Sequence, residues 1–230
     1  MQRAAHLSCI YVTSDPSDAF ALANRIAVMH EGRIQQISTR AELLNAPANL
    51  WIAEWLGSPP MNTVTGYLQG TYQPEGIRYR VWAKGFAPLL SAKWTRLLES
   101  LQLKEIILGI RPESIIPEWE LAEKWKPSFY TVQGEVLMCE WNQGKTIVQL
   151  QLPNVDETFI ADFALAPGRV KVGQRITLGF DPEDFRLFHP QTRQLLHEAF
   201  VSFEWNSNLA KPKKRLLLDF LDRRNSGRFI

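Results

Sequence analysis

The chain has 230 residues, 45% of them hydrophobic and 22% charged, which is the composition of an ordinary globular protein with one or two domains. A net charge of +2 gives no reason to expect nucleic acid or an acidic partner. The sequence has no apolar run near the roughly 20 residues of a membrane-spanning helix, and its first nine residues, MQRAAHLSC, lack the apolar core of a signal peptide.

The first predicted elements lie between Ile10 and Gln36. The pattern predicts a strand at 10–12, a helix opened by Asp15 and Pro16, and two strands at 25–29 and 33–37 around a turn at Glu31-Gly32. Asp15 is placed to cap the helix, and Asp18 adds a first-turn acid. Ala19, Leu22 and Ala23 share one helical face and are expected to pack against the strands.

Two short helices and a boundary follow. Thr39 and Glu42 have the spacing of a capping box, and the pair Trp51 and Trp55 marks a second helix that ends at Gly57. The sequence Ser58-Pro59-Pro60 removes two backbone donors and forbids a continuing helix, so it predicts a domain boundary there.

From Met61 onward the pattern changes to strands around one amphipathic helix at 94–101. The predicted strands are 77–82, 105–110, 129–141, 146–152, 158–163, 174–180 and 185–188. Two similar sequences, Gly109-Ile110-Arg111-Pro112-Glu113 and Gly179-Phe180-Asp181-Pro182-Glu183, indicate one strand–turn element used twice. The fold class is therefore α+β, mainly β, with a barrel-like second part.

Several patterns that suggest chemistry have simpler explanations. Gly144-Lys145-Thr146 ends like a P-loop, but residue 139 is Cys where a P-loop needs Gly, and a strand follows where a helix is required, so a hairpin turn is predicted. Asp181, Glu183 and Asp184 surround a proline and are interpreted as turn formers rather than as an acid/base pair.

The cysteines and histidines predict no metal site. Cys9 and Cys139 lie in separate β-like runs without metal-ligand spacing, so reduced, buried thiols of a cytosolic protein are favoured over a disulfide. The histidines are equally scattered and are interpreted as surface or turn residues: His6, His30, His189 and His197.

Four stretches together resemble the ATP-binding subunits of ABC transporters, in the branch of sugar importers of the maltose and glycerol-phosphate type. Ile10 to Gln36 resembles the strand, switch loop, helix and hairpin that follow the Walker B strand, and Thr39 to Asn62 resembles the exit from the nucleotide-binding domain. Leu108 to Ile115, LGIRPESI, and Leu178 to Phe188, LGFDPEDFRLF, resemble elements of the branch's OB-like regulatory domain, called TOBE.

The resemblance implies an incomplete ATP site. The family's switch histidine, which reaches the γ-phosphate of ATP, corresponds to Ser14, with Asp15 beside it, and a serine hydroxyl is shorter and does not titrate near neutral pH. The P-loop, Q-loop, signature and Walker B carboxylate are expected before residue 1. ATP and Mg²⁺ serve the intact family, but this chain alone is expected to bind neither, to hold no catalytic residue and not to hydrolyse ATP.

The resulting prediction is a C-terminal fragment or truncated form of such a subunit, serving dimerisation and regulation of a carbohydrate importer. Its divisions are 1–57, a remnant of the nucleotide-binding domain, 58–62, a linker, 63–210, the TOBE domain, and 211–230, a basic amphipathic tail. The implied partners are the membrane subunits and an ATPase dimer partner, with self-association through the TOBE domain and a cytoplasmic position at the inner face of the membrane.

Two alternatives stay open. The chain is alternatively a free-standing OB-type module for an oligonucleotide, a sugar or an oxyanion, for which Arg78, Arg80 and Trp82 are the only aromatic-basic trace. The tail after residue 210 has seven basic and two acidic residues. It is expected to form a helix whose apolar side docks on the fold or on a partner, and this is favoured over membrane binding.

Overall fold

The computed structural model describes residues 9–74, 76–142, 144–165 and 168–197. Its helices are α1 (Pro16–Leu22), α2 (Arg40–Asn45), α3 (Leu50–Trp55), α4 (Thr95–Leu101) and α5 (Glu118–Lys124), with 3₁₀ turns η1 (Ala92–Trp94) and η2 (Pro112–Ser114). Its strands are β1 (Ile26–His30), β2 (Arg33–Ser38), β3 (Asn62–Gln73), β4 (Gly76–Trp82), β5 (Glu105–Ile110), β6 (Ile115–Pro117), β7 (Tyr130–Asn142), β8 (Lys145–Gln151), β9 (Thr158–Phe163), β10 (Arg175–Phe180) and β11 (Arg186–Phe188). The tail at 211–230 lies outside the described residues.

The N-terminal elements form a small layer with its own apolar core. The antiparallel hairpin β1–β2 turns at Glu31-Gly32, where both residues have positive φ, as the sequence predicted. Helices α2 and α3 pack on it through five buried side chains: Ile26, Val28, Leu43, Ile52 and Leu56. Helix α1 adds Ala19 and Phe20 to this core, and none of its side chains is fully buried.

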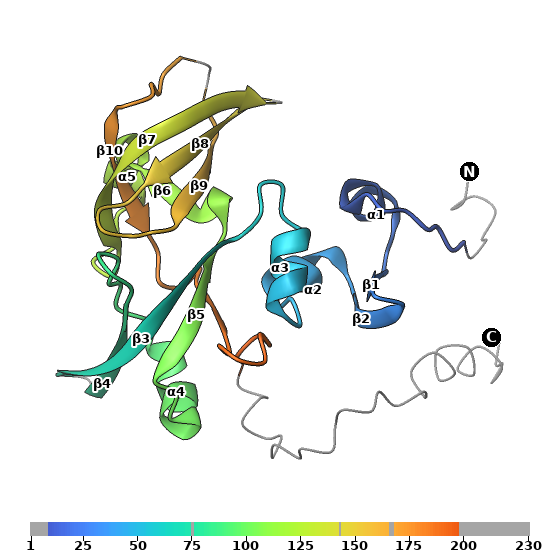
Figure 1. Ribbon diagram of the computed structural model, residues 1–230, viewed down its shortest axis with the longest axis horizontal. Helices are drawn as coiled ribbons and strands as arrows, with labels where there is room; N and C mark the ends of the chain where they lie inside the picture. Colours follow the sequence, from blue (N-terminus) through green and yellow to red (C-terminus); the bar gives the residue numbers. More distant parts are fainter. Residues whose placement is uncertain (1–8, 75, 143, 166–167, 198–230) are drawn as a thin grey trace. The chain divides into compact units, whose positions relative to one another are not determined.

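The remaining strands form two antiparallel sheets (Figure 1). Each sheet has one edge strand that comes from the other half of the chain. The four-stranded sheet has the order β11-β5-β3-β4, and the five-stranded sheet has the order β6-β10-β7-β8-β9. After β5 the chain turns and enters β6, which pairs with β10 of the other sheet. After β10 it turns again and enters β11, which pairs with β5. Each sheet is therefore completed by a strand from the other half of the chain.

The two halves repeat each other in sequence and in register. Thr63-Val64-Thr65-Gly66 on β3 corresponds to Thr131-Val132-Gln133-Gly134 on β7. Thr63 lies opposite Gly109 of β5, and Thr131 lies opposite Gly179 of β10. The repeated strand–turn element is thereby confirmed, because both copies end a central strand and both turn through an i to i+3 backbone bond.

A cluster of aromatic rings and one buried amide join the two sheets. Phe86, in the connection after β4, meets the rings of Phe180 at 5.1 Å and Phe159 at 5.4 Å, both from the five-stranded sheet. Asn62 of β3 donates to the carbonyl oxygen of Ile160 on β9 at 2.8 Å and accepts from its backbone N–H at 2.6 Å. The core between the sheets is thus aromatic, with a polar pair at its edge.

The predicted mainly β, α+β class is confirmed, and most of the predicted elements lie within a residue or two of their expected bounds. The strand at 10–12 is wrong, because no described strand pairs with this segment and Ile10 and Val12 are both 89% exposed. Leu22 and Ala23 are exposed rather than packed, and Phe20 contributes to the core with Ala19 instead. Three elements were not predicted: the long strand β3, helix α5 and the three-residue strand β6. No helix among the described residues is long and apolar enough to span a membrane.

Candidate functional site

The predicted site residues Ser14 and Asp15 lie at the exposed start of α1. The Asp15 carboxylate accepts bonds from the hydroxyl and the backbone N–H of Ser17, the latter at 2.8 Å, and these bonds lower the pKa of Asp15. Asp15 is therefore confirmed as the cap of α1. A role for Ser14 at a γ-phosphate stays a prediction.

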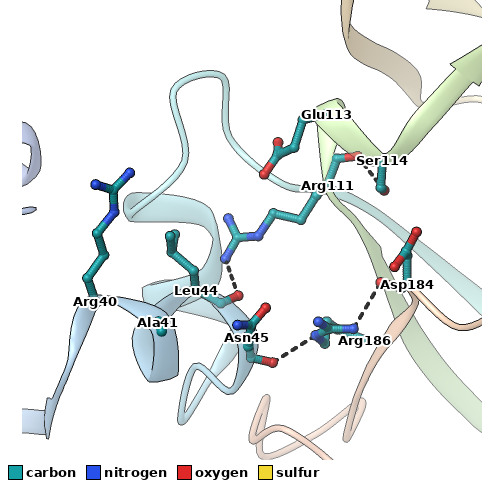
Figure 2. Close-up of a pocket in the computed structure, with 9 residues that line it drawn as sticks. All are labelled: Arg40, Ala41, Leu44, Asn45, Arg111, Glu113, Ser114, Asp184 and Arg186. Carbon is teal, nitrogen blue, oxygen red and sulfur yellow. Dashed lines mark hydrogen bonds between the residues drawn. The ribbon is translucent and has the colours of Figure 1, made fainter.

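A pocket of about 660 Å³ opens where the N-terminal layer meets the strand–turn elements (Figure 2). Three of its lining residues are arginines from different elements: Arg40 begins α2, Arg111 follows β5 and Arg186 begins β11. The rest of the wall consists of Ala41, Leu44, Asn45, Glu113, Ser114 and Asp184. The pocket therefore brings together cations that lie far apart in the sequence.

Two of these arginines connect α2 and α3 to the four-stranded sheet. The Arg111 guanidinium donates to the carbonyl oxygens of Leu44 at 3.0 Å and Ala53 at 3.3 Å, and Arg186 Nε donates to that of Asn45 at 2.8 Å. The last carbonyls of a helix lack partners within the helix, so a cation placed there satisfies them. These contacts hold α2 and α3 in a fixed place beside β5 and β11.

Apolar contacts strengthen the same junction. Leu50 and Ala53 of α3 belong to one buried cluster with four residues of the sheet side: Met61, Ile107, Phe188 and Leu195. Backbone bonds add to it, from the Leu50 N–H to the Arg193 carbonyl oxygen at 2.8 Å. The junction thus combines buried apolar area with charged hydrogen bonds.

The charges of the pocket are only partly balanced. Burial lowers the pKa of Arg111 and of Arg186, although Glu113 and Asp184 respectively oppose the shift. A guanidinium stays protonated in proteins even so. The pKa of Asp184 is raised, first by burial and then by the neighbouring Asp181 carboxylate. The pocket is therefore a cationic site with two carboxylates in its wall.

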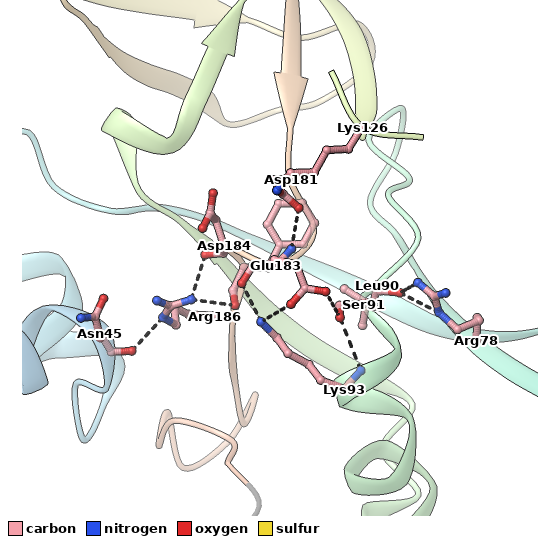
Figure 3. A network of polar contacts seen from close by, with 11 residues as sticks. Asn45, Arg78, Leu90, Ser91, Lys93, Lys126, Asp181, Glu183, Asp184 and Arg186 are labelled. Atoms are coloured by element: carbon pink, nitrogen blue, oxygen red, sulfur yellow. Dashed lines mark hydrogen bonds and ion pairs between the residues drawn. The ribbon is translucent and has the colours of Figure 1, made fainter. Parts of the chain in front are cut away.

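The second strand–turn element is held by a polar network (Figure 3). The Glu183 carboxylate accepts from the Ser91 hydroxyl, the largest cause of its lowered pKa, and pairs with Lys93 at 3.0 Å. Lys126 pairs with the buried Asp181 at 2.6 Å, and Asp181 Oδ1 accepts from the Glu183 N–H at 3.0 Å. The interpretation of these acids as turn formers is confirmed.

The aromatic-basic trace on β4 is used largely for structure. Arg78 donates to the carbonyl oxygen of Leu90 at 3.1 Å, and Arg80 donates to that of Ala87. Exposed aromatic area remains beside them, because Tyr67 and Trp82 lie opposite each other on β3 and β4. The two guanidinium groups are thus turned toward the protein's own backbone.

The other patterns follow their simpler explanations, with one correction. Strands β7 and β8 pair directly across the turn that contains Gly144, so the hairpin prediction is confirmed. His189 accepts two backbone bonds within a turn, and His30 stacks on Trp51 at 4.0 Å. His6 lies outside the described residues.

The prediction of two buried thiols is wrong for Cys9, which is exposed because its segment pairs with no described strand, while Cys139 is half-buried. No group of three potential ligands fit for a metal occurs in the described parts of the chain.

Comparison with known proteins gives first a domain family and then relatives. Residues 57–115 match the MalK OB fold domain family. The xylose/arabinose import ATP-binding protein XacK of Haloferax volcanii is 30% identical over 193 residues, covering 83% of this chain and 46% of the relative. The oligosaccharides import ATP-binding protein MsmX of Bacillus subtilis is 30% identical over 183 residues, covering 80% and 47%. The trehalose/maltose import ATP-binding protein MalK of Thermococcus litoralis is 31% identical over 194 residues, covering 84% and 49%.

These findings confirm the resemblance to ATP-binding subunits of ABC sugar importers over most of the chain. The chain spans about half the length of the curated relatives it matches. A solved structure of the molybdate-binding protein ModG covers 56% of this chain and 96% of its own, at 15% identity and a TM-score of 0.43. That likeness is too low to bear on the function.

The sequence did not reveal the junction. Arg111 stood out only as part of a repeated turn, yet its guanidinium binds residues 58 and 67 positions earlier. No local pattern encodes a bond of that range. The one signal in the sequence was an arginine placed before a proline at the end of a predicted strand.

Proposed function

We propose that this chain serves as the dimerisation and regulatory part of an ABC importer ATP-binding subunit for a carbohydrate and holds no ATP site of its own. The relatives' names and the MalK OB fold match support the importer class and the regulatory module. We propose residues 9–57 as a piece of the nucleotide-binding domain and the sheets from residue 63 as the TOBE domain. Partners are then the membrane subunits and a second ATPase subunit, and the chain works on the cytoplasmic side, peripheral to the membrane.

One observation carries the proposal: α2 and α3 are fixed to the four-stranded sheet by Arg111, which follows β5, and by Arg186 of β11. A regulatory module must sense the ATPase through a stiff contact, because a flexible tether would transmit no displacement. Charged bonds to helix carbonyls, backed by buried apolar side chains, make such a contact. A movement of the ATPase would then reach β5 and β11 directly.

The N-terminal layer exposes apolar side chains that indicate a contact surface for further protein. Ile10, Val12, Leu22 and Met29 are each more than half exposed. The layer has only the two-stranded sheet β1–β2 among its described residues, and an isolated hairpin is marginally stable in water. Such a surface is typical of one that packs against further protein. We propose the ATPase body as that neighbour.

Calorimetry with ATP and Mg²⁺ tests the central point on the 230-residue chain. We expect no saturable binding, since no P-loop pattern occurs in the sequence and the candidate at Gly144 belongs to a hairpin. A dissociation constant below about 100 μM, worth roughly 5.5 kcal/mol, would contradict the proposal. Sedimentation in the same buffer tests self-association, and a monomer at about 100 μM would remove the dimerisation role.

The free-standing OB-type module is the second candidate, and the exposed pair Tyr67 and Trp82 favours it. Aromatic faces stack on bases or sugar rings. Against it, Arg78 and Arg80 already bind backbone carbonyls. Filter binding of a single-stranded oligonucleotide at two salt concentrations separates the candidates, because true nucleic-acid binding weakens steeply with salt.

A further inference from the structure

The pocket lined by Arg40, Arg111 and Arg186 holds three cations and two carboxylates, so its net charge is positive. None of Arg40, Arg111 and Arg186 forms an ion pair with a carboxylate within the described part of the chain. Arg111 is only 9% exposed, and buried cations are costly unless they are paired. Within the described residues, the side chains of Arg111 and Arg186 donate to neutral carbonyl oxygens. Glu113 and Asp184 therefore balance the positive charge of the pocket only in part.

The guanidinium groups also keep free donors. Each guanidinium has five N–H donors, and Arg111 uses two of its nitrogens on Leu44 and Ala53. Arg40 contacts the ring of Phe20 from 5.2 Å, and its side chain lies on the other side of Leu44 from Arg111 (Figure 2). Planar guanidinium groups are the preferred partners of phosphate and carboxylate, which they bind with two parallel bonds.

The rest of the wall suits hydroxyl groups. Glu113 and Asp184 offer carboxylate acceptors, and Asn45 and Ser114 add short polar side chains. A volume of about 660 Å³ is far larger than a bare ion needs and lies in the range of small-molecule sites. The wall therefore combines oxyanion-binding cations with hydroxyl-binding acceptors in one space.

We propose that this pocket binds a small polyhydroxylated molecule that carries a phosphate or carboxylate group. The oxyanion lies between Arg40 and Arg111, and the hydroxyl groups donate to Glu113 and Asp184. Such a ligand joins α2 to the turn after β5, so its binding tightens the junction. Binding at this pocket goes beyond the proposed function, since it needs neither ATP nor a transporter.

Calorimetry on the full 230-residue chain tests it with four probes: glucose 6-phosphate, gluconate, inorganic phosphate and glucose. We expect saturable binding of glucose 6-phosphate or gluconate, weaker binding of inorganic phosphate, and none of glucose. The first two probes distinguish a phosphate ligand from a carboxylate ligand. Failure of all four to bind up to about 10 mM overturns the proposal, and so does binding of glucose as tight as that of the charged sugars.

Variants decide whether the binding is in this pocket. Arg40→Gln removes a pocket cation whose contact among the described residues is with the Phe20 ring, and we expect at least about 5-fold weaker binding. Arg96→Gln makes the same charge change at an exposed position of α4, outside the pocket, and should alter affinity less than about 2-fold. Glu113→Gln removes a repelling carboxylate and should tighten inorganic phosphate. Equal losses in Arg40→Gln and Arg96→Gln would show general charge attraction and overturn the site. Unchanged urea midpoints confirm that each variant folds.

Discussion

Replacing Asn62 tests most directly how the two sheets are held together. Its side chain is 7% exposed and makes three hydrogen bonds: to the Ile110 carbonyl oxygen at 3.2 Å, to the Ile160 carbonyl oxygen at 2.8 Å, and from the Ile160 N–H at 2.6 Å. Ile160 lies 98 residues away in the other sheet. Asn62→Ala removes all three bonds and leaves the half-buried Ile160 N–H without this acceptor.

The expected loss follows from the number of bonds. A buried hydrogen bond contributes about 1 kcal/mol net, so three bonds predict a loss of about 3 kcal/mol of unfolding free energy. With a urea slope of about 2 kcal/mol/M, the midpoint should fall by about 1.5 M. Asn62→Asp keeps the size and the acceptor but turns a donor into a carboxylate that faces two carbonyl oxygens. It should cost more than Asn62→Ala at neutral pH.

Urea unfolding followed by tryptophan fluorescence measures both variants. The carboxyl introduced by Asn62→Asp should have a raised pKa in the folded state, so the added cost of this substitution should shrink as the pH falls toward the unfolded value of about 3.9. A midpoint change below about 0.5 M in Asn62→Ala would refute the reasoning. It would mean that the sheets hold together through the aromatic core alone.

Three further predictions concern a turn, a titrating group and local stability. Gly85→Ala should cost at least about 2 kcal/mol in urea unfolding, because φ is +124° and the added Cβ overlaps the Pro153 carbonyl oxygen. Gly76→Ala, with the same φ and open space, should cost less and isolates the backbone contribution. Asp184→Asn should raise the midpoint at pH 7, because the raised pKa of Asp184 means that its charged form is disfavoured in the fold. The gain should fade as the pH falls through that pKa toward 3.8, and a gain that grows on acidification would be inconsistent. Hydrogen exchange should be faster in 9–57 than in the two sheets, since α1 buries no side chain fully, and equal protection would contradict this.

Local chemistry made part of the fold predictable. Thr39 and Glu42 form the expected capping box, because both bonds close within four residues. The strand at 10–12 failed for the opposite reason: β propensity counts only where a neighbouring strand offers a ladder, and none is described there. Strand β6 is too short to show a period, and its existence depends on β10, far along the chain.

The candidate site was less predictable than the fold. Ser14 and Asp15 were found through resemblance, and only the capping role of Asp15 follows from local geometry. The pocket arginines Arg40, Arg111 and Arg186 carry no shared pattern, because three distant segments meet there only after the sheets have formed. Residue types alone gave no distance between them.

Strands β6 and β11 make each sheet depend on both halves of the chain. β6 comes from the first half and pairs with β10 of the second, and β11 comes from the second half and pairs with β5 of the first. Neither half can therefore complete its own sheet alone. A chain cut near residue 127, between the halves, should therefore yield two pieces that bind each other. For the same reason, we expect two chains at high concentration to exchange halves, so that each chain completes the sheets of the other. The product would be a domain-swapped dimer.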